Sequence, residues 1–243
     1  YTIGRHDKNY PLSEGKGSLK EGGIREPMIV CYPHVAKPST INDTPVIIED
    51  FFPTLLEIAG VCDYRTPQHI DGISFLKQIK GHAGDKERAL FFHYPNNWGE
   101  RRQTIGAPQS AVVAGDWKLI HYYESGSACL YNLENDISEN DDLSARYPDK
   151  AKELAKVLSD YLKSQHATMP ILKLTGRTVP YPDGGKRDGP YWGSAKRDCR
   201  QGGNHAIPGR KVPDTGEGIY QERAAWDRRS RCTDGRRCKN RKD

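Results

Sequence analysis

A glycine-rich segment near the start of the chain constrains its fold more than any other part of the sequence. Residues 9–27 read NYPLSEGKGSLKEGGIREP, with four glycines around Lys16, Glu21 and Arg25. Glycine accepts positive φ values and lets the backbone approach a ligand closely, so Gly-Lys-Gly predicts a tightly folded loop that presents an ammonium group. Such a compact charge suits a tetrahedral oxyanion, phosphate or sulfate. By itself, this stretch is also typical of a solvated surface turn.

The segment does not fit the phosphate-binding P-loop. That motif needs Gly, four residues and then Gly-Lys-Ser/Thr, with a strand before it and a helix after it. Here Gly17 follows Lys16, and the apolar run MIVCYP comes next at residues 28–33. This run predicts a strand over residues 28–32, with Cys31 as a buried strand residue.

Two helices are expected from apolar periodicity. Residues 45–60 carry apolar side chains at three- and four-residue spacing, which predicts one buried helical face, with a kink or restart at Pro53 and a stop at Gly60. Residues 150–163 predict a second, amphipathic helix with lysines on its outer face. The apolar positions of the first helix are Ile48, Phe51, Phe52, Leu55, Leu56 and Ala59.

Four short strands complete the pattern. Residues 90–95, LFFHYP, predict a buried strand that delivers His93 to a loop. Residues 110–123 predict a hairpin with its turn at Gly115-Asp116, and residues 128–133 predict a further strand. With the helix at 150–163 on one side, these strands indicate a small α+β unit.

In chain order, these segments resemble the motifs of the sulfatases, the sulfate-ester hydrolases of the alkaline-phosphatase superfamily. Residues 11–27 match that family's lysine-bearing pattern, P-L-x-x-G-K-G-[ST]-x-x-E-G-G-x-R-x-P. Residues 50–60 match D-x-x-P-T-L-L-E-[IL]-A-G, and residues 71–74 match D-G-x-S. The phrases GDWKLI at 115–120 and LYNL at 130–133 resemble the family's carboxy-terminal subdomain. The chain departs from the commonest form after Pro95, where a second histidine is frequent.

The resemblance implies an α/β fold. The chain would be the carboxy-terminal part of an alkaline-phosphatase-like sulfatase fold, with a small α+β subdomain of one antiparallel sheet plus one helix. We expect residues 1–107 to end the large domain, 108–183 to form the subdomain and 184–243 to form a basic tail. The tail has a net charge of +8 and no Leu, Phe or Met, which predicts disorder or a product of a reading-frame error.

The resemblance also implies the chemistry. A sulfatase is a sulfuric ester hydrolase that uses formylglycine and bound Ca²⁺, or Mg²⁺ in some members. Lys16 would contact the sulfate, and His93 would face the leaving-group side of the substrate. For His93, the alternative to this substrate contact is a hydrogen-bonded structural role. Glu21 and Arg25 are expected to pair within the loop or with its neighbours.

The parts of a sulfatase that carry out the reaction are missing from the sequence. No C/S-x-P-x-R occurs, and the nearest string, CYPHV at residues 31–35, lacks the arginine. Residues 1–8 contain a single aspartate, whereas hard cations need several oxygen ligands. We therefore expect no catalytic nucleophile and no metal ligand in this chain, which would be the inactive back half of a sulfatase.

Two other functions stay open. One is a phosphoesterase or phosphonate hydrolase of the same superfamily, and the other is a non-catalytic chain whose basic tail binds a polyanion. For the sulfatase reading we expect a sulfated small molecule or glycan as substrate, no membrane partner and no nucleic acid partner. No run approaches the ~20 apolar residues of a membrane helix. The family suggests a periplasmic, secreted or lysosomal-type compartment.

Overall fold

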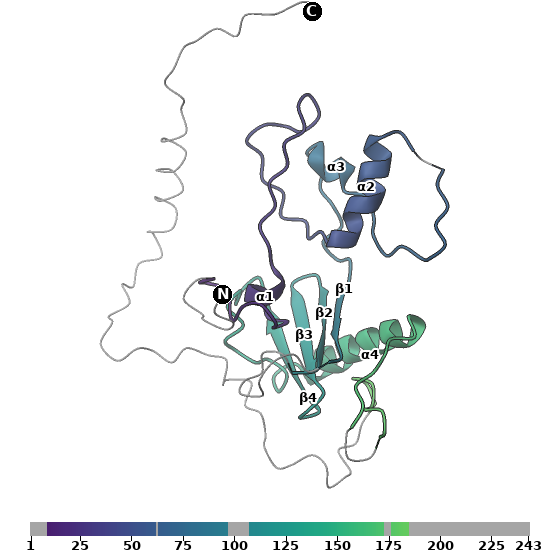
Figure 1. Cartoon of the computed structure of the whole chain (residues 1–243). Helices are drawn as coiled ribbons and strands as arrows, with labels where there is room; N and C mark the ends of the chain where they lie inside the picture. Colours follow the sequence, from purple (N-terminus) through teal and green to yellow (C-terminus); the bar gives the residue numbers. More distant parts are fainter. Residues whose placement is uncertain (1–8, 62, 97–106, 173–175, 185–243) are drawn as a thin grey trace, which may run out of the picture. The chain divides into compact units, whose positions relative to one another are not determined.

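A computed structural model describes residues 9–61, 63–96, 107–172 and 176–184 of the chain (Figure 1). The elements are, in order, α1 (Glu21–Ile24), η1 (Ile48–Asp50), α2 (Phe51–Ile58), α3 (Leu76–Ile79), β1 (Leu90–Tyr94), β2 (Gln109–Ala114), β3 (Trp117–Tyr122), β4 (Ser127–Asn132) and α4 (Pro148–Ser164). Among these described residues, no helix is both long and apolar enough to span a bilayer.

The four strands form one antiparallel sheet in the order β1-β2-β3-β4 (Figure 1). Gly115 has φ +56° in the two-residue turn between β2 and β3, the left-handed conformation that tight hairpin turns need. The four strands predicted between residues 90 and 133 are confirmed, each within one residue of its expected bounds. The predicted helix at 150–163 is confirmed as α4.

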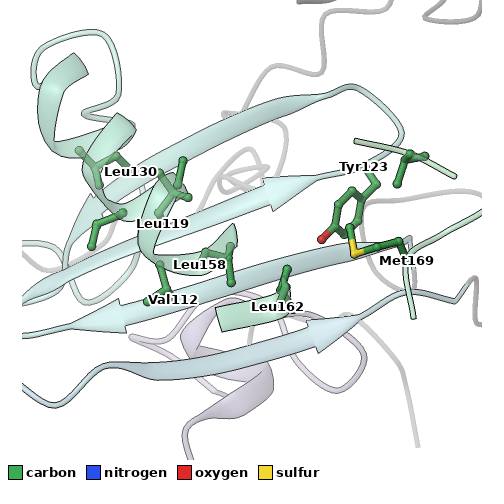
Figure 2. Packing of buried hydrophobic residues seen from close by; sticks show 10 residues of the cluster. Val112, Leu119, Tyr123, Leu130, Leu158, Leu162 and Met169 are labelled. Carbon is green, nitrogen blue, oxygen red and sulfur yellow. The ribbon is translucent and has the colours of Figure 1, made fainter. Parts of the chain in front are cut away.

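One face of the sheet is covered by α4. Because side chains alternate along a strand, every second residue of β2, β3 and β4 points to this side. Figure 2 shows the resulting cluster, in which Leu158 and Leu162 of α4 lie among apolar side chains of the sheet. Each large apolar side chain buried in this way contributes about 1.5–3 kcal/mol to stability. The cluster is formed by Val112, Leu119, Tyr123, Leu130, Leu154, Ala155, Leu158, Leu162, Met169 and Val179.

The opposite face of the sheet carries the glycine-rich segment. Ala111, Ile120 and Tyr131 form the centre of a second apolar cluster, and Leu19 joins them from the segment that contains Lys16. The sheet therefore lies between α4 on one side and the candidate site on the other.

The α2 helix agrees with its prediction only in part. Pro53 lies in the first turn of α2, where a proline costs no intrahelical hydrogen bond, and the predicted restart matches the start of α2 directly after the 3₁₀ turn. Gly60 has φ +75° and ends the helix as expected. The predicted buried face is wrong: Ile48 and Leu55 are 76% and 60% exposed. The buried side of α2 is instead the one that carries Pro53 and Thr54.

The predicted strand at residues 28–32 is also wrong. These residues have no regular structure, Ile29 is 95% exposed, and Cys31 is exposed rather than buried. A strand needs a neighbour to satisfy its backbone N–H and C=O groups, and no strand in the described part of the chain pairs with this run. Apolar composition alone does not make a strand.

Two domain boundaries are predicted from the sequence, one near residue 107 and another near residue 184. β1 pairs with β2 over its full length, so the sheet includes β1. The residues of β1 lie in the segment that was predicted to end the large domain. The division into domains stays a prediction. The predicted basic tail, apart from Gly184, lies outside the described residues.

Candidate functional site

The residues around Lys16 form a loop that hydrogen bonds close at its base. The amide N–H of Gly22 donates to the carbonyl of Ser13 at 2.8 Å, so residues 13–22, here called the lysine loop, begin and end at the same place. The side-chain amide of Asn9 fastens this base, since Nδ2 donates to the carbonyls of Glu14 at 3.2 Å and Gly22 at 2.9 Å. Lys16 is exposed within the loop.

The paired glycines after the lysine have a steric reason. A Cβ atom on Gly22 would lie 2.3 Å from the carbonyl oxygen of Ser13, and one on Gly23 would lie 2.2 Å from that of Ser18. Real Cβ atoms do not come so close to backbone oxygen, so the loop can close only with glycine at both positions. The Glu-Gly-Gly sequence is thus explained by the approach of two backbone segments.

A buried ion network lies beneath the lysine loop. Nζ of Lys118 on β3 is 2.8 Å from Oε1 of Glu21 and 2.9 Å from Oε1 of Glu139. The side chains of Lys118 and Glu139 are fully buried, and that of Glu21 is 7% exposed. Arg25 confirms its predicted pairing, with Nη1 3.3 Å from Oε2 of Glu21. Burial raises the pKa of Glu139 above its usual range, although Lys118 acts in the opposite direction.

Residues 138 and 139 hold the lysine loop at two further points. The Lys20 ammonium donates to the carbonyl of Glu139 at 3.2 Å and lies 5.3 Å from the centre of the Tyr131 ring, a cation–π distance. The hydroxyl of Ser13 donates to the carbonyl of Ser138, whose own hydroxyl donates to the carbonyl of Pro11 at 2.5 Å. Both ends of the loop are therefore attached to the turn that follows β4.

His93 lies on the α4 face, opposite the lysine loop. Its Nδ1 is 2.7 Å from the Ser110 hydroxyl, and its Nε2 is 2.9 Å from the carbonyl oxygen of Thr168. Ser110 is also 2.8 Å from the hydroxyl of Tyr123, whose pKa burial raises to about 12. Both ring nitrogens have partners within the chain, which favours the structural alternative for His93. Contact of Lys16 or His93 with a substrate stays a prediction.

The described residues do not form a metal site. No group of three or more His, Cys, Asp or Glu side chains gathers within residues 9–61, 63–96, 107–172 and 176–184. The residues described here do not fit the calcium ion that the resemblance implies, and we derive no step through it.

Sequence reasoning missed the two residues that anchor the lysine loop, Lys118 and Glu139. Lys118 shares a strand face with Ile120 and Tyr122, and a charged residue among inward-facing apolar ones is a signal of a buried ion pair. Glu139 lies in a polar stretch without periodicity and has φ +53°. Nothing in that stretch marks it as buried.

Comparisons with known proteins identify a matching family model and relatives of the chain. Residues 15–168 match the family model described as N-sulphoglucosamine sulphohydrolase, C-terminal. A sulfatase from Formosa agariphila is 34% identical over 189 residues, which cover 72% of this chain and 33% of the relative. Arylsulfatase K from Xenopus laevis is 28% identical over 147 residues, which cover 59% of this chain and 27% of the relative.

The fold has solved counterparts as well. The crystal structure of Ps i-CgsB in complex with k-i-k-neocarrahexaose superposes with a TM-score of 0.54 at 26% identity, over 70% of this chain and 36% of that chain. The chain thus spans about a third of the length of the proteins it matches.

Proposed function

Because this chain belongs to the sulfatase family, we propose that the full-length protein, a chain as long as its relatives, hydrolyses sulfate esters with the lysine loop in its substrate site. The observation that carries the proposal is an exposed lysine in a loop closed by hydrogen bonds and attached to the sheet by buried ion pairs. A cation fixed before the reaction stabilises developing negative charge without reorganisation at the moment of reaction.

The role proposed for Lys16 rests on the charge of its side chain and on the closed loop that carries it. Its ammonium would lie against the sulfate oxygens and offset the charge that builds up in the transition state. Formylglycine as nucleophile and a calcium or magnesium ion belong to the same proposal, and both would be supplied by parts of the protein other than the described residues. The 243-residue chain alone is accordingly inactive in this proposal.

The substrate class proposed is a sulfated glycan. The oligosaccharide held by Ps i-CgsB supports this choice, because that structure shares its fold with most of this chain. A periplasmic, secreted or lysosomal-type compartment would bring the protein into contact with such material.

The test is hydrolysis of three aryl esters by the full-length protein: a sulfate, a phosphate and a phosphonate monoester. We expect the highest kcat/KM with the sulfate. A preference for the phosphate or the phosphonate would instead favour the rival enzyme of the same superfamily.

The 243-residue chain supplies the second half of the test. With aryl sulfate and calcium it should show no turnover above a heat-killed control, and turnover would contradict the proposal. Salt-dependent binding to a polyanion that disappears when residues 184–243 are deleted would favour the non-catalytic alternative.

A further inference from the structure

We infer that Lys118 is a positioning residue for Lys16, acting through Glu21 and Glu139. The inference rests on the proposed function of Lys16 and concerns what holds the lysine loop in place. It assigns a task in substrate binding to a buried side chain in the middle of the sheet.

Lys118 is the cation at the centre of the buried ion network. The ammonium of Lys118 has three protons to donate and lies between two carboxylates, at 2.8 Å from Glu21 and 2.9 Å from Glu139. Without this ammonium, the buried carboxylate of Glu139 would lose its ion pair with Lys118. Glu21 would keep only its pair with the largely exposed Arg25. Buried ions that lose their partner are strongly destabilised, so they would separate or take up water.

Glu21 belongs to the lysine loop, and Glu139 is hydrogen-bonded to the loop from outside it. Glu21 directly precedes Gly22, whose N–H closes the loop on Ser13. Its side chain is held by Lys118 at 2.8 Å, and its backbone N–H donates to Oε2 of Glu139 at 2.6 Å. Separation of Glu21 from Glu139 would therefore move the base of the loop itself.

The strand that carries Lys118 is a rigid support for the lysine loop. Lys118 belongs to β3, which pairs with β2 on one side and β4 on the other, opposite Val113 and Tyr131. A central strand bonded along both edges cannot follow a moving loop. The loop is therefore placed by the sheet, and a displacement of only about 1 Å at a reacting group can lower a rate about 10²-fold.

A merely structural role for Lys118 makes a different prediction. If the ion pairs only stabilised the chain, loss of Lys118 would loosen all described elements alike and would act independently of Lys16. If Lys118 positions Lys16, its loss loosens the lysine loop selectively, and its effect on catalysis disappears once Lys16 is gone.

Hydrogen exchange of the 243-residue chain, followed by mass spectrometry, measures the first difference. In Lys118→Met we expect amides of residues 13–22 to exchange about tenfold faster or more, while α4 stays protected. The control is Lys156→Met, which removes an exposed ion pair with Asp160 on α4 and should leave the loop unchanged. Unchanged protection of the loop in Lys118→Met, or rapid loop exchange in the unsubstituted chain, would overturn the inference.

A charge-neutral variant covers the case in which Lys118→Met fails to fold. The triple substitution Lys118→Met, Glu21→Gln and Glu139→Gln leaves no buried ion without a partner, so the sheet and α4 should keep their protection. The loop should still exchange faster, because the ion pairs to Glu21 are gone. A loop as protected as in the unsubstituted chain would contradict the inference.

A double-mutant cycle in the full-length protein measures the second difference. We expect Lys118→Met to lower kcat/KM for an aryl sulfate about 10- to 10²-fold, and to have no further effect in the Lys16→Ala background. Additive effects would overturn the inference. If Lys16→Ala itself changed nothing, the proposed function would fail, while the exchange result would still decide whether Lys118 holds the loop.

Discussion

At the scale of single residues, the carboxyl group of Glu139 is held where ionisation is unfavourable. Burial raises its pKa above the ordinary value of 4.5, against the pull of the Lys118 ammonium. A carboxyl group whose pKa is higher in the folded chain binds its proton more tightly there than in the unfolded chain. Its contribution to stability is therefore complete below about pH 4.5 and is lost as the pH rises through the folded-state pKa.

Glu139→Gln tests this directly. The variant cannot ionise at this position, so its free energy of unfolding should fall less steeply above about pH 4.5 than that of the unsubstituted chain. Urea unfolding at a series of pH values measures the slope. Glu153→Gln, at an exposed position on α4, is the matched control and should leave the slope unchanged. Equal slopes for Glu139→Gln and the unsubstituted chain would show that Glu139 does not cause the fall of the free energy of unfolding with pH.

The candidate site could be predicted only in part. The glycines predicted a tightly folded loop around Lys16, because the backbone freedom of glycine is a local property that the sequence shows directly. The anchors could not be found in the same way: Glu21 meets Lys118 across 97 positions of sequence and Glu139 across 118. Such contacts depend on the pairing of distant strands, which no local pattern encodes.

At the scale of elements, α4 packs against the sheet through a buried apolar cluster. Leu158 is fully buried at the centre of the cluster between α4 and the sheet (Figure 2). Leu158→Ala should lower the free energy of unfolding by about 2–5 kcal/mol, the usual cost of a cavity in a packed core. Lys156→Ala, on the exposed side of the same helix, should change it by less than about 0.5 kcal/mol. A small loss for Leu158→Ala, measured by thermal or urea unfolding, would mean that this cluster is not the core.

The elements were predictable where the pattern and the packing agree. The hairpin of β2 and β3 has both alternation and turn residues, and α4 has a stripe that meets the sheet. The run at residues 28–32 has the composition of a strand but no partner strand in the described part of the chain. For α2, the apolar periodicity correctly predicted a helix. Periodicity alone does not show whether another element covers the apolar face.

At the scale of the whole molecule, the exposed apolar side chains of α2 predict association of the chain when it is produced by itself. Leu55 is 60% exposed, and burial of such a side chain against another surface is favourable. Leu55→Gln should lower the concentration-dependent light scattering of the 243-residue chain. Ile171→Gln, at a residue 63% exposed elsewhere, is the control and should have less effect. Scattering unchanged by Leu55→Gln would exclude this face as the cause.

In the proposed function, the charge of Lys16 links this chain to the activity of the full-length protein. Its loop is closed, sterically determined by glycine and attached to the sheet through buried ions, and its lysine is exposed. These features of the loop are explained if the ammonium of Lys16 must contact a sulfate group at a fixed position.

The most direct measurement is kcat/KM for an aryl sulfate with the full-length protein, its Lys16→Ala variant and a Lys37→Ala control. Lys37 is exposed and lies outside the lysine loop, so its loss should leave kcat/KM unchanged. Lys16→Ala should lower kcat/KM about 10²- to 10³-fold, comparable to the loss of one donor that stabilises transition-state charge. A value within a factor of a few of the unsubstituted protein would contradict the account, since Lys16 would then be an ordinary surface lysine.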